Sequence, residues 1–443
     1  TLLAQGALAP SAISTTARYL GAAQVLVRND LLTEEIGGPS PAVVDKQVQA
    51  DPGLTSIKDY GPRGRDTLPG VTGTATEAQR KADPKDAALT PVSTYQVEEP
   101  EPVVRSVPVT NQVLVDGDGE SFSAMSWASL LDASPTVRYL GDLNRATLEA
   151  ALHDGARLVM TDTNRRRAWD INRITNATSA TLGARDDIDA GNGATVTLWP
   201  DNPSKQTVTE VLGVRSIEAD LPAFGLHPYG RAGQAFDGDP TTGWQTGGLG
   251  TAAGDRLEVT LDEPTVITKL SVTPLNSAPS RVSSISVRMG STVVVQQIPA
   301  GSGPITIPVP PTRTSNVIIT ILSQTPGSNP VGIAEVAIND LEVREVTRLP
   351  RTLVRLADKA DAATRKAIAA APLDIVLTRA RGSVADLTDD EESQLDRRFE
   401  LPGRRTFLFS AELSVNGADP ALVASLRRGS AAARACQQVA VLD

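Results

Sequence analysis

The stretch AFDGDPTTGW, residues 235–244, gathers oxygen ligands at a spacing that suits a hard cation. Asp237, Asp239 and Thr242 offer two carboxylates and a hydroxyl within one short loop. Calcium takes six or more oxygen ligands from carboxylates, hydroxyls and backbone carbonyls. Glu335, near the far end of the same β-rich region, would add a carboxylate from a second segment. Asp-Gly and Asp-Pro are also common turn formers, so the loop alone leaves a plain surface turn open.

Short β-strands are the elements that would position this loop. Residues 205–347 hold seven runs rich in Val, Ile and Thr, separated by Gly, Pro, Asn and Ser. Helical periodicity is absent from these runs, and strands of this length between turn residues are typical of a sandwich. The sequence therefore predicts an all-β sandwich, with the loop near its start and Glu335 on a strand near its end.

The same residues resemble the discoidin family, also called the coagulation factor 5/8 C-terminal type, which includes many carbohydrate-binding modules. The resemblance rests on Asp237, Gly238, Asp239, Thr242, Trp244, Ala334, Glu335 and Val336. It implies a jelly-roll-like sandwich in which Asp237, Asp239, Thr242 and Glu335 hold a structural Ca²⁺. It also implies that Trp244 belongs to the core beneath the loop and that any glycan binds at loop tips.

A candidate glycan site precedes the motif in the segment FGLHPYGR. His227 and Tyr229 offer ring faces that stack on sugar C–H surfaces, and Arg231 offers paired hydrogen-bond donors. The alternative is a solvated loop with one buried aromatic side chain. Aromatic residues make up only 3% of the chain, so the sequence is poor in stacking platforms.

The remainder of the chain predicts α/β structure, so the fold class is multidomain α/β plus all-β. Residues 1–60 alternate helix and strand, with AQVLVRND as a buried parallel strand. Residues 61–102 are rich in Gly, Pro and charge and predict a linker or excursion. Residues 103–204 read strand, helix, strand, helix, strand, which predicts a parallel sheet. Residues 348–443 predict a helical segment leading into a second, truncated sandwich.

Two further groups of side chains are candidates for binding or catalysis. Asp162, Asn164 and Arg165 follow the third predicted strand, and ligands bind at the carboxyl edge of parallel sheets. Helix capping and a solvated arginine face are the competing interpretation. Ser121 lies in a near match to a nucleophile elbow that lacks the last glycine, with His153 or His227 as the base. A serine hydrolase is therefore a remote alternative.

Composition excludes several classes of protein. The formal net charge of −10 argues against a nucleic-acid partner, which would require a basic surface. The single cysteine, Cys436, excludes an internal disulfide. The sequence contains no apolar run long enough to cross a membrane, and Thr1 opens no signal peptide. We therefore expect the chain to be a soluble piece of a larger protein.

The runs RYLGAAQVLVRNDLL, VLVDGDGESF and RLVMTDTNRRRAW resemble the soluble C-terminal region of actinobacterial, AftD-like α-(1→3)-arabinofuranosyltransferases. The resemblance implies a glycan-binding scaffold on the periplasmic side of the membrane, with arabinan as partner. The parent protein would be the glycosyltransferase, acting in arabinogalactan and lipoarabinomannan synthesis. Its catalytic residues would lie in an upstream membrane-embedded core, so we expect none in this chain. A stand-alone carbohydrate-binding or adhesion protein is the alternative from a different class.

Overall fold

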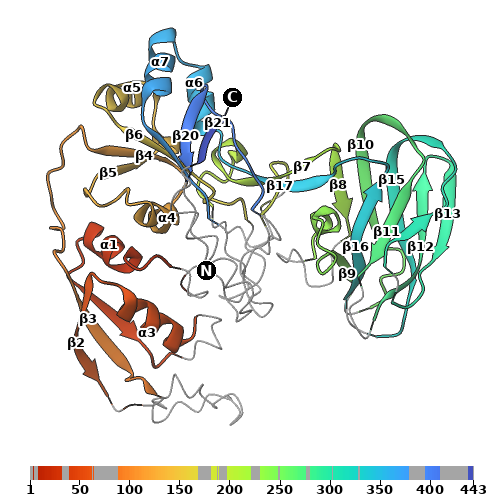
Figure 1. The fold of residues 1–443 in the computed structure, drawn as a ribbon, viewed down its shortest axis with the longest axis horizontal. Helices are drawn as coiled ribbons and strands as arrows, with labels where there is room; N and C mark the ends of the chain where they lie inside the picture. The colour runs from red at the N-terminus through yellow and green to blue at the C-terminus, as the bar shows by residue number, and fades with distance from the viewer. Residues whose placement is uncertain are drawn as a thin grey trace.

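The computed structural model describes residues 3, 8–31, 39–61, 63, 88–167, 181–186, 188, 197–220, 230–247, 250–275, 280–301, 303–327, 330–378, 395–409 and 438–442. An N-terminal sheet and an α/β unit lie at one side of the molecule, and a β-sandwich lies at the other (Figure 1). Two paired strands, β7 (Val208–Leu212) and β17 (Arg344–Arg348), connect the sandwich to the α/β unit.

The N-terminal unit is a small antiparallel sheet with two helices. Its strands have the order β1 (Gln24–Arg28), β3 (Val92–Val97), β2 (Leu54–Tyr60), and its helices are α1 (Ala12–Tyr19) and α3 (Pro41–Ala50). Ser40 caps α3 by accepting a hydrogen bond from the Val43 N–H, as expected for serine before a helix. The predicted buried parallel strand is therefore wrong, because β1 is an antiparallel edge strand with three exposed residues.

The predicted linker also contains a β-strand that its amino-acid composition does not indicate. Within residues 61–102, Val92–Val97 forms β3, the central strand of the N-terminal sheet. Ser93, Tyr95 and Val97 are buried while the residues between them are half-buried. This period of two is the signature of a strand with one face on a core, and Pro91 and the acidic run after Val97 mask it.

The α/β unit contains the predicted parallel sheet and one additional strand. In chain order its first elements are β4 (Gln112–Asp116), α4 (Ser121–Trp127), β5 (Thr136–Tyr139), η2 (Leu140–Asp142), α5 (Arg145–His153) and β6 (Arg157–Thr161). The Asn144 side chain accepts from the Thr147 N–H and begins α5 with a capping box. The sheet order is β18-β6-β4-β5, all parallel, which confirms the parallel sheet.

The fourth strand of that sheet follows the sandwich in the sequence. After β17 the chain forms α6 (Thr352–Asp358), α7 (Ala362–Ala370) and β18 (Leu373–Val376). Leu353 and Ile368 pack into the same core as Leu114, Leu148 and Leu158. This part of residues 348–443 thus completes the α/β unit, which corrects the prediction of a separate segment. Of the predicted second sandwich, the described residues show one antiparallel pair, β20 (Arg405–Phe409) with β21 (Gln438–Leu442).

The sandwich consists of two antiparallel sheets, as predicted. One has the order β13 (Thr292–Gln297), β12 (Val282–Met289), β15 (Thr312–Gln324), β10 (Arg256–Ile267), β8 (Ser216–Ala219). The other has the order β14 (Ile305–Ile307), β11 (Leu270–Pro274), β16 (Pro330–Ile338), β9 (Trp244–Gly247). Alternate residues of several strands are buried, for example along β11, and the inner faces of the two sheets share one core.

The junction between the two units is built from strands and two short turns of 3₁₀ helix. β7 pairs antiparallel with β17, and β19 (Arg397–Arg398) pairs parallel with β17 from the other side. η4 (Pro203–Lys205) precedes β7, and η5 (Ala232–Phe236) packs against β17 within the sandwich. The sandwich is therefore an insertion between β6 and α6 of the α/β unit.

Candidate functional site

The sequence motif forms a compact loop between η5 and β9. The two carboxylate oxygens of Asp237 accept hydrogen bonds from within the loop, Oδ1 from the Asp239 N–H at 2.9 Å and Oδ2 from the Thr242 hydroxyl at 2.7 Å. Gly238 adopts a φ of 77°, which favours glycine because it lacks a Cβ. The loop therefore holds the Asp237 side chain in one defined position.

The carboxylate of Asp239 has a different role from that of Asp237. Its Oδ1 accepts from both the N–H and the hydroxyl of Thr241, at 2.9 and 2.6 Å. Its backbone carbonyl accepts from the Thr242 hydroxyl at 3.0 Å. The carboxylate thus stabilises the turn, as Asx side chains commonly do, and the carbonyl lies next to the Thr242 hydroxyl.

Glu335, on β16, meets Asp237 across the end of the sandwich. Burial, and then the charge and the hydrogen bond of Asp237, raise the pKa of Glu335 to about 7. Its Oε1 is buried and has no hydrogen-bond partner among the described residues. Two carboxylates from distant segments are therefore held together in a partly dry environment, which is costly without a compensating positive charge.

The fit to a metal ion can be judged from these groups. No cluster of three or more His, Cys, Asp or Glu side chains in the described part of the chain is arranged to hold a metal. The pair Asp237–Glu335, with the Thr242 hydroxyl beside it, supplies oxygen donors of the kind that calcium prefers. The structure thus brings together part of the predicted ligand set, and calcium itself stays a prediction.

Trp244 occupies the position that the resemblance implies. Its side chain is 0% exposed in the sandwich core, and its indole N–H donates to the Asp220 carbonyl at 2.9 Å. Its backbone pairs with Ile333 of β16. Because Trp244 follows the carboxylate loop directly, this packing fixes one end of the loop.

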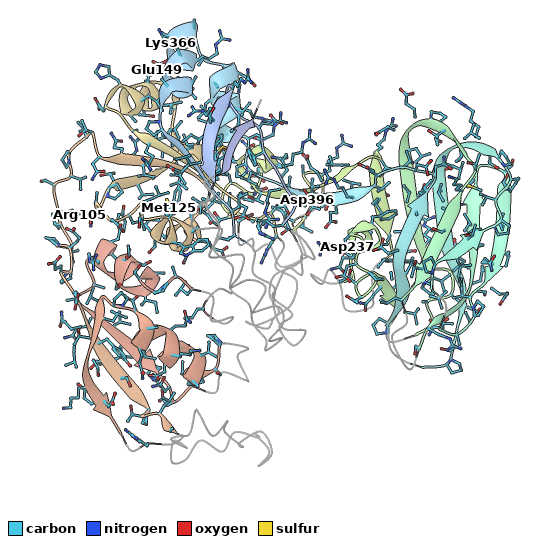
Figure 2. All side chains as sticks on the ribbon, viewed as in Figure 1. Arg105, Met125, Glu149, Asp237, Lys366 and Asp396 are labelled. Atoms are coloured by element: carbon cyan, nitrogen blue, oxygen red, sulfur yellow. The ribbon has the colours of Figure 1, made fainter. Side chains whose placement is uncertain are left out.

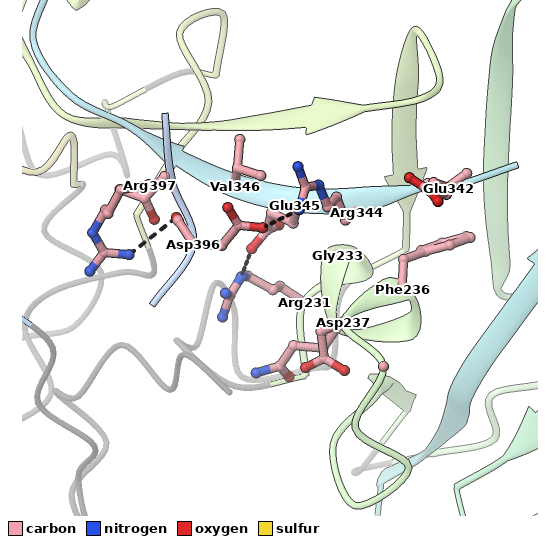
Figure 3. Close-up of a pocket in the computed structure, with 14 residues that line it drawn as sticks. Arg231, Gly233, Phe236, Asp237, Glu342, Arg344, Glu345, Val346, Asp396 and Arg397 are labelled. Atoms are coloured by element: carbon pink, nitrogen blue, oxygen red, sulfur yellow. Dashed lines mark hydrogen bonds and ion pairs between the residues drawn. The ribbon is translucent and has the colours of Figure 1, made fainter. Parts of the chain in front are cut away.

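A pocket of about 380 Å³ lies beside the carboxylate loop, where the sandwich meets the junction (Figure 3). η5 and the loop form one wall, and β17 and β19 form the other. Arg231 pairs with Glu345 at 2.6 Å, and Arg344 pairs with Asp396 at 3.1 Å. Figure 2 labels Asp237 and Asp396, which both lie near this junction.

The close approach of the two walls depends on a glycine. A Cβ added to Gly233 would lie 2.0 Å from Glu345 Oε2, so any side chain at this position would displace Glu345. Sequence reasoning missed Arg344, Glu345 and Asp396 as members of a pocket. No local signal could have found them, because Asp396 reaches the pocket only through the pairing of β19 with β17.

The predicted glycan residues are described only in part. His227 and Tyr229 lie outside the described residues. Arg231 lines the pocket, and its side chain is 19% exposed. The predicted loop-tip site is therefore represented by Arg231 alone, and this residue faces the junction.

The predicted ligand edge of the α/β sheet is occupied by the chain itself. Asp162 is fully buried and accepts from Arg397 at 2.7 Å and from the Thr378 N–H at 3.1 Å. Asn164, also buried, accepts from the Leu198 N–H at 2.8 Å and donates to the Lys205 carbonyl at 3.0 Å. These contacts correct the prediction for Asp162 and Asn164, whose polar groups join segments of the fold.

The neighbouring residues at this edge also contact other segments of the chain. Arg165 forms a β-bridge with Thr207. Asp116, at the end of β4, accepts from the Leu353 N–H of α6 at 3.1 Å, and burial raises its pKa to about 6. Later segments of this chain therefore occupy the edge of the sheet at which doubly wound folds bind ligands.

Ser121 does not have the geometry of a nucleophile. Its side chain is 0% exposed, and its hydroxyl contacts those of Thr161 at 3.0 Å and Thr163 at 2.7 Å. His153 ends α5 with its side chain 89% exposed and pairs with Asp154. The serine-hydrolase alternative is therefore wrong for the pair Ser121–His153, because the hydroxyl is enclosed and, among the described residues, hydrogen-bonds only to other hydroxyls and a backbone N–H.

Two family models match the chain. Residues 1–195 match the N-terminal GT-C domain of α-(1→3)-arabinofuranosyltransferase, and residues 215–349 match the third carbohydrate binding module of arabinofuranosyltransferase D. Curated α-(1→3)-arabinofuranosyltransferases from Mycolicibacterium smegmatis and Mycobacterium tuberculosis are 28% and 27% identical to this chain. Each alignment covers 77% of this chain and 24% of the relative, so the chain spans about a quarter of their length.

The solved structures agree at the level of the fold. The cryo-EM structure of arabinofuranosyltransferase AftD from mycobacteria gives a TM-score of 0.59 at 22% identity, covering 79% of this chain and 27% of that chain. A mutant of that protein gives a TM-score of 0.62 at 20% identity, covering 88% and 31%. No helix among the described residues combines the length and apolar character of a membrane span.

Residues 215–349, which match a carbohydrate binding module of arabinofuranosyltransferase D, form a β-sandwich inserted into an α/β scaffold. In both matched regions the chain is therefore similar to segments of arabinofuranosyltransferases, one of them a carbohydrate binding module.

Proposed function

We propose that this chain is the extracytoplasmic, glycan-binding part of a cell-envelope arabinofuranosyltransferase and that its partner is arabinan. The match of residues 215–349 to a carbohydrate binding module of arabinofuranosyltransferase D carries the proposal, since the described residues of this range form a two-sheet sandwich. Catalysis belongs to a membrane-embedded core elsewhere in the parent protein. The chain itself positions the growing polysaccharide on the periplasmic side.

The proposal predicts direct binding of arabinan fragments. In a calorimetric titration, the full chain should bind a linear arabinofuranose tetrasaccharide with a dissociation constant on the order of 0.1–1 mM, because a small polar site gains little net free energy per contact. A linear glucose tetrasaccharide is the control. Equal binding of both sugars would favour a general adhesion or carbohydrate-binding protein, and binding of neither would refute the proposal.

Calcium is a second part of the proposal. Asp237 and Glu335, assisted by the Thr242 hydroxyl and loop carbonyls, would hold a calcium ion whose role is to neutralise two adjacent carboxylates and fix the loop. The unpartnered Glu335 Oε1 beside Asp237 supports it. The ion would have a structural role, since no reacting group lies on this loop.

Removal of calcium should therefore lower the stability of the sandwich in a pH-dependent way. At tenfold saturation a bound ion stabilises by about 1.4 kcal/mol, which EDTA would abolish. Protonation of Glu335 competes with the ion, so the stabilisation should be larger at pH 8 than at pH 6. In EDTA the pH dependence of the stability is reversed. The pKa of Glu335 rises from 4.5 to about 7 on folding, so stability should fall as pH rises through this range.

Calorimetry of the full chain with calcium or EDTA measures both effects. Glu335→Gln should remove the calcium response and its pH dependence, whereas Glu263→Gln, at an exposed position of β10, should leave both intact. An unfolding transition that is insensitive to EDTA in the wild type at pH 8 would argue against the calcium site.

A further inference from the structure

We infer that the pocket between η5 and β17 is a subsite for a neutral sugar, and that a glycan bound there contacts both the inserted sandwich and the junction that carries it. The inference rests on the proposed function and deepens it, because it assigns the glycan to a pocket that contains Arg231 of the predicted glycan site together with residues of the junction. Its residues come from three segments that are distant in sequence, around Arg231, Glu345 and Asp396.

The charges of the lining indicate an uncharged ligand. Three arginines and four carboxylates line the pocket, so the lining is slightly negative. Arg231 pairs with Glu345, Arg344 with Asp396, and Arg397 with Asp162 outside the pocket. An anionic group such as phosphate binds where cations are in excess, which is not the case here. Paired guanidinium and carboxylate groups instead offer donors and acceptors side by side, which is the pattern that vicinal hydroxyls require.

The volume and exposure are consistent with a small ligand. About 380 Å³ lies at the lower end of the range for small-molecule sites, roughly 300–1,000 Å³. The polar side chains are least exposed at the floor of the pocket and most exposed at its rim. Glu345 is 14% exposed and Arg231 19%, whereas Asp396 is 32% and Arg344 58% exposed. The floor groups are partly desolvated, so their hydrogen bonds to a ligand would contribute more than those at the rim.

The position of the pocket gives binding a mechanical consequence. One wall belongs to the sandwich through η5, and the other belongs to β17 and β19 of the junction (Figure 3). Beyond the pocket, Arg397 is anchored by Asp162 of the α/β unit. A sugar held between these walls would therefore restrain the sandwich relative to the α/β unit, and the scaffold would present its glycan in one orientation.

The test uses the full chain, a linear arabinofuranose tetrasaccharide and two variants. Arg344→Ala removes an exposed rim group and should weaken binding about threefold. Glu345→Gln keeps the size of the side chain but removes the charge facing Arg231 and should weaken binding about tenfold. Arg288→Ala, at an exposed site on β12, is the matched control and should bind like the wild type. Hydrogen exchange of residues 341–347 should slow when the tetrasaccharide is added to the wild type.

The outcomes separate the subsite from the proposed function. If the wild type binds the tetrasaccharide and both variants retain its affinity, the subsite is refuted and the glycan-binding function stands. If the wild type binds only a different neutral oligosaccharide and both variants lose it, the subsite stands and arabinan is refuted. Binding of no glycan refutes both. Competition by inorganic phosphate at millimolar concentration would overturn the assignment of a neutral ligand.

Discussion

Replacing Asp162 by alanine is expected to lower the free energy of unfolding of the α/β unit by about 3–5 kcal/mol, the usual cost of breaking a buried ion pair. Its partner Arg397 is 2% exposed and would keep its charge in the protein interior without the carboxylate. The N–H and hydroxyl of Thr378 would also lose their acceptor. Asp162 therefore ties the end of β6 to the segments that follow β18 and contain β19.

Denaturant unfolding followed by circular dichroism would measure this loss, with Arg398→Ala as the control. Arg398 is adjacent to Arg397, but its ion pair with Glu210 is half-exposed, so its removal should cost no more than about 1 kcal/mol. The double variant Asp162→Leu with Arg397→Met should recover most of the stability, since apolar pairs often replace buried ion pairs without loss. Equal costs for Asp162→Ala and Arg398→Ala would contradict the structural role assigned to Asp162.

The same ion pair shows where prediction from the sequence was limited. TDTNRRRAW follows a buried strand, and the carboxyl edge of a parallel sheet is a common ligand site, so the sequence leaves Asp162 open as a ligand residue or as a helix cap. The strand order β18-β6-β4-β5 changes this interpretation. β18 lies more than two hundred residues after β6 in the chain, and no local pattern indicates that the sheet resumes after an inserted sandwich.

The sandwich was predictable because its signals are local. Val, Ile and Thr recur with period two in its strands, and Gly, Pro or Asn separate them, so each strand is visible without knowledge of its partners. The proximity of Glu335 to Asp237 followed from the family resemblance. The turn role of Asp239 did not, because the competition between Thr241 and a metal for its carboxylate is decided by loop geometry.

The pocket illustrates a third kind of limit. Arg231 was singled out for its paired donors, but its partner Glu345 lies in a strand that pairs with β7 and β19 at the junction. The alternating charges around Glu345 form a pattern that any solvent-exposed strand can show. Only the insertion topology brings it against η5, so the pocket depends on tertiary pairing and could not be read from composition or spacing.

The second large effect is expected at Trp244. Trp244→Ala should lower the free energy of unfolding of the sandwich by about 3–5 kcal/mol, because a fully buried indole is replaced by a cavity. The structure has little capacity to close that cavity by backbone movement. At Gly332 of the neighbouring strand, even a Cβ would lie 1.7 Å from the Trp244 carbonyl, so the two strands are already in close contact.

Trp244→Phe separates the packing of the indole from its hydrogen bond. The phenyl ring fills much of the space but leaves the Asp220 carbonyl without its donor, so this variant should cost about 1–3 kcal/mol. Calorimetry should show both losses in the transition of the sandwich and neither in that of the α/β unit. Because Trp244 holds the end of the loop that contains Asp237, Trp244→Ala should also weaken the response to calcium more than Trp244→Phe. A sandwich transition that both variants leave unchanged would mean that Trp244 does not anchor this loop.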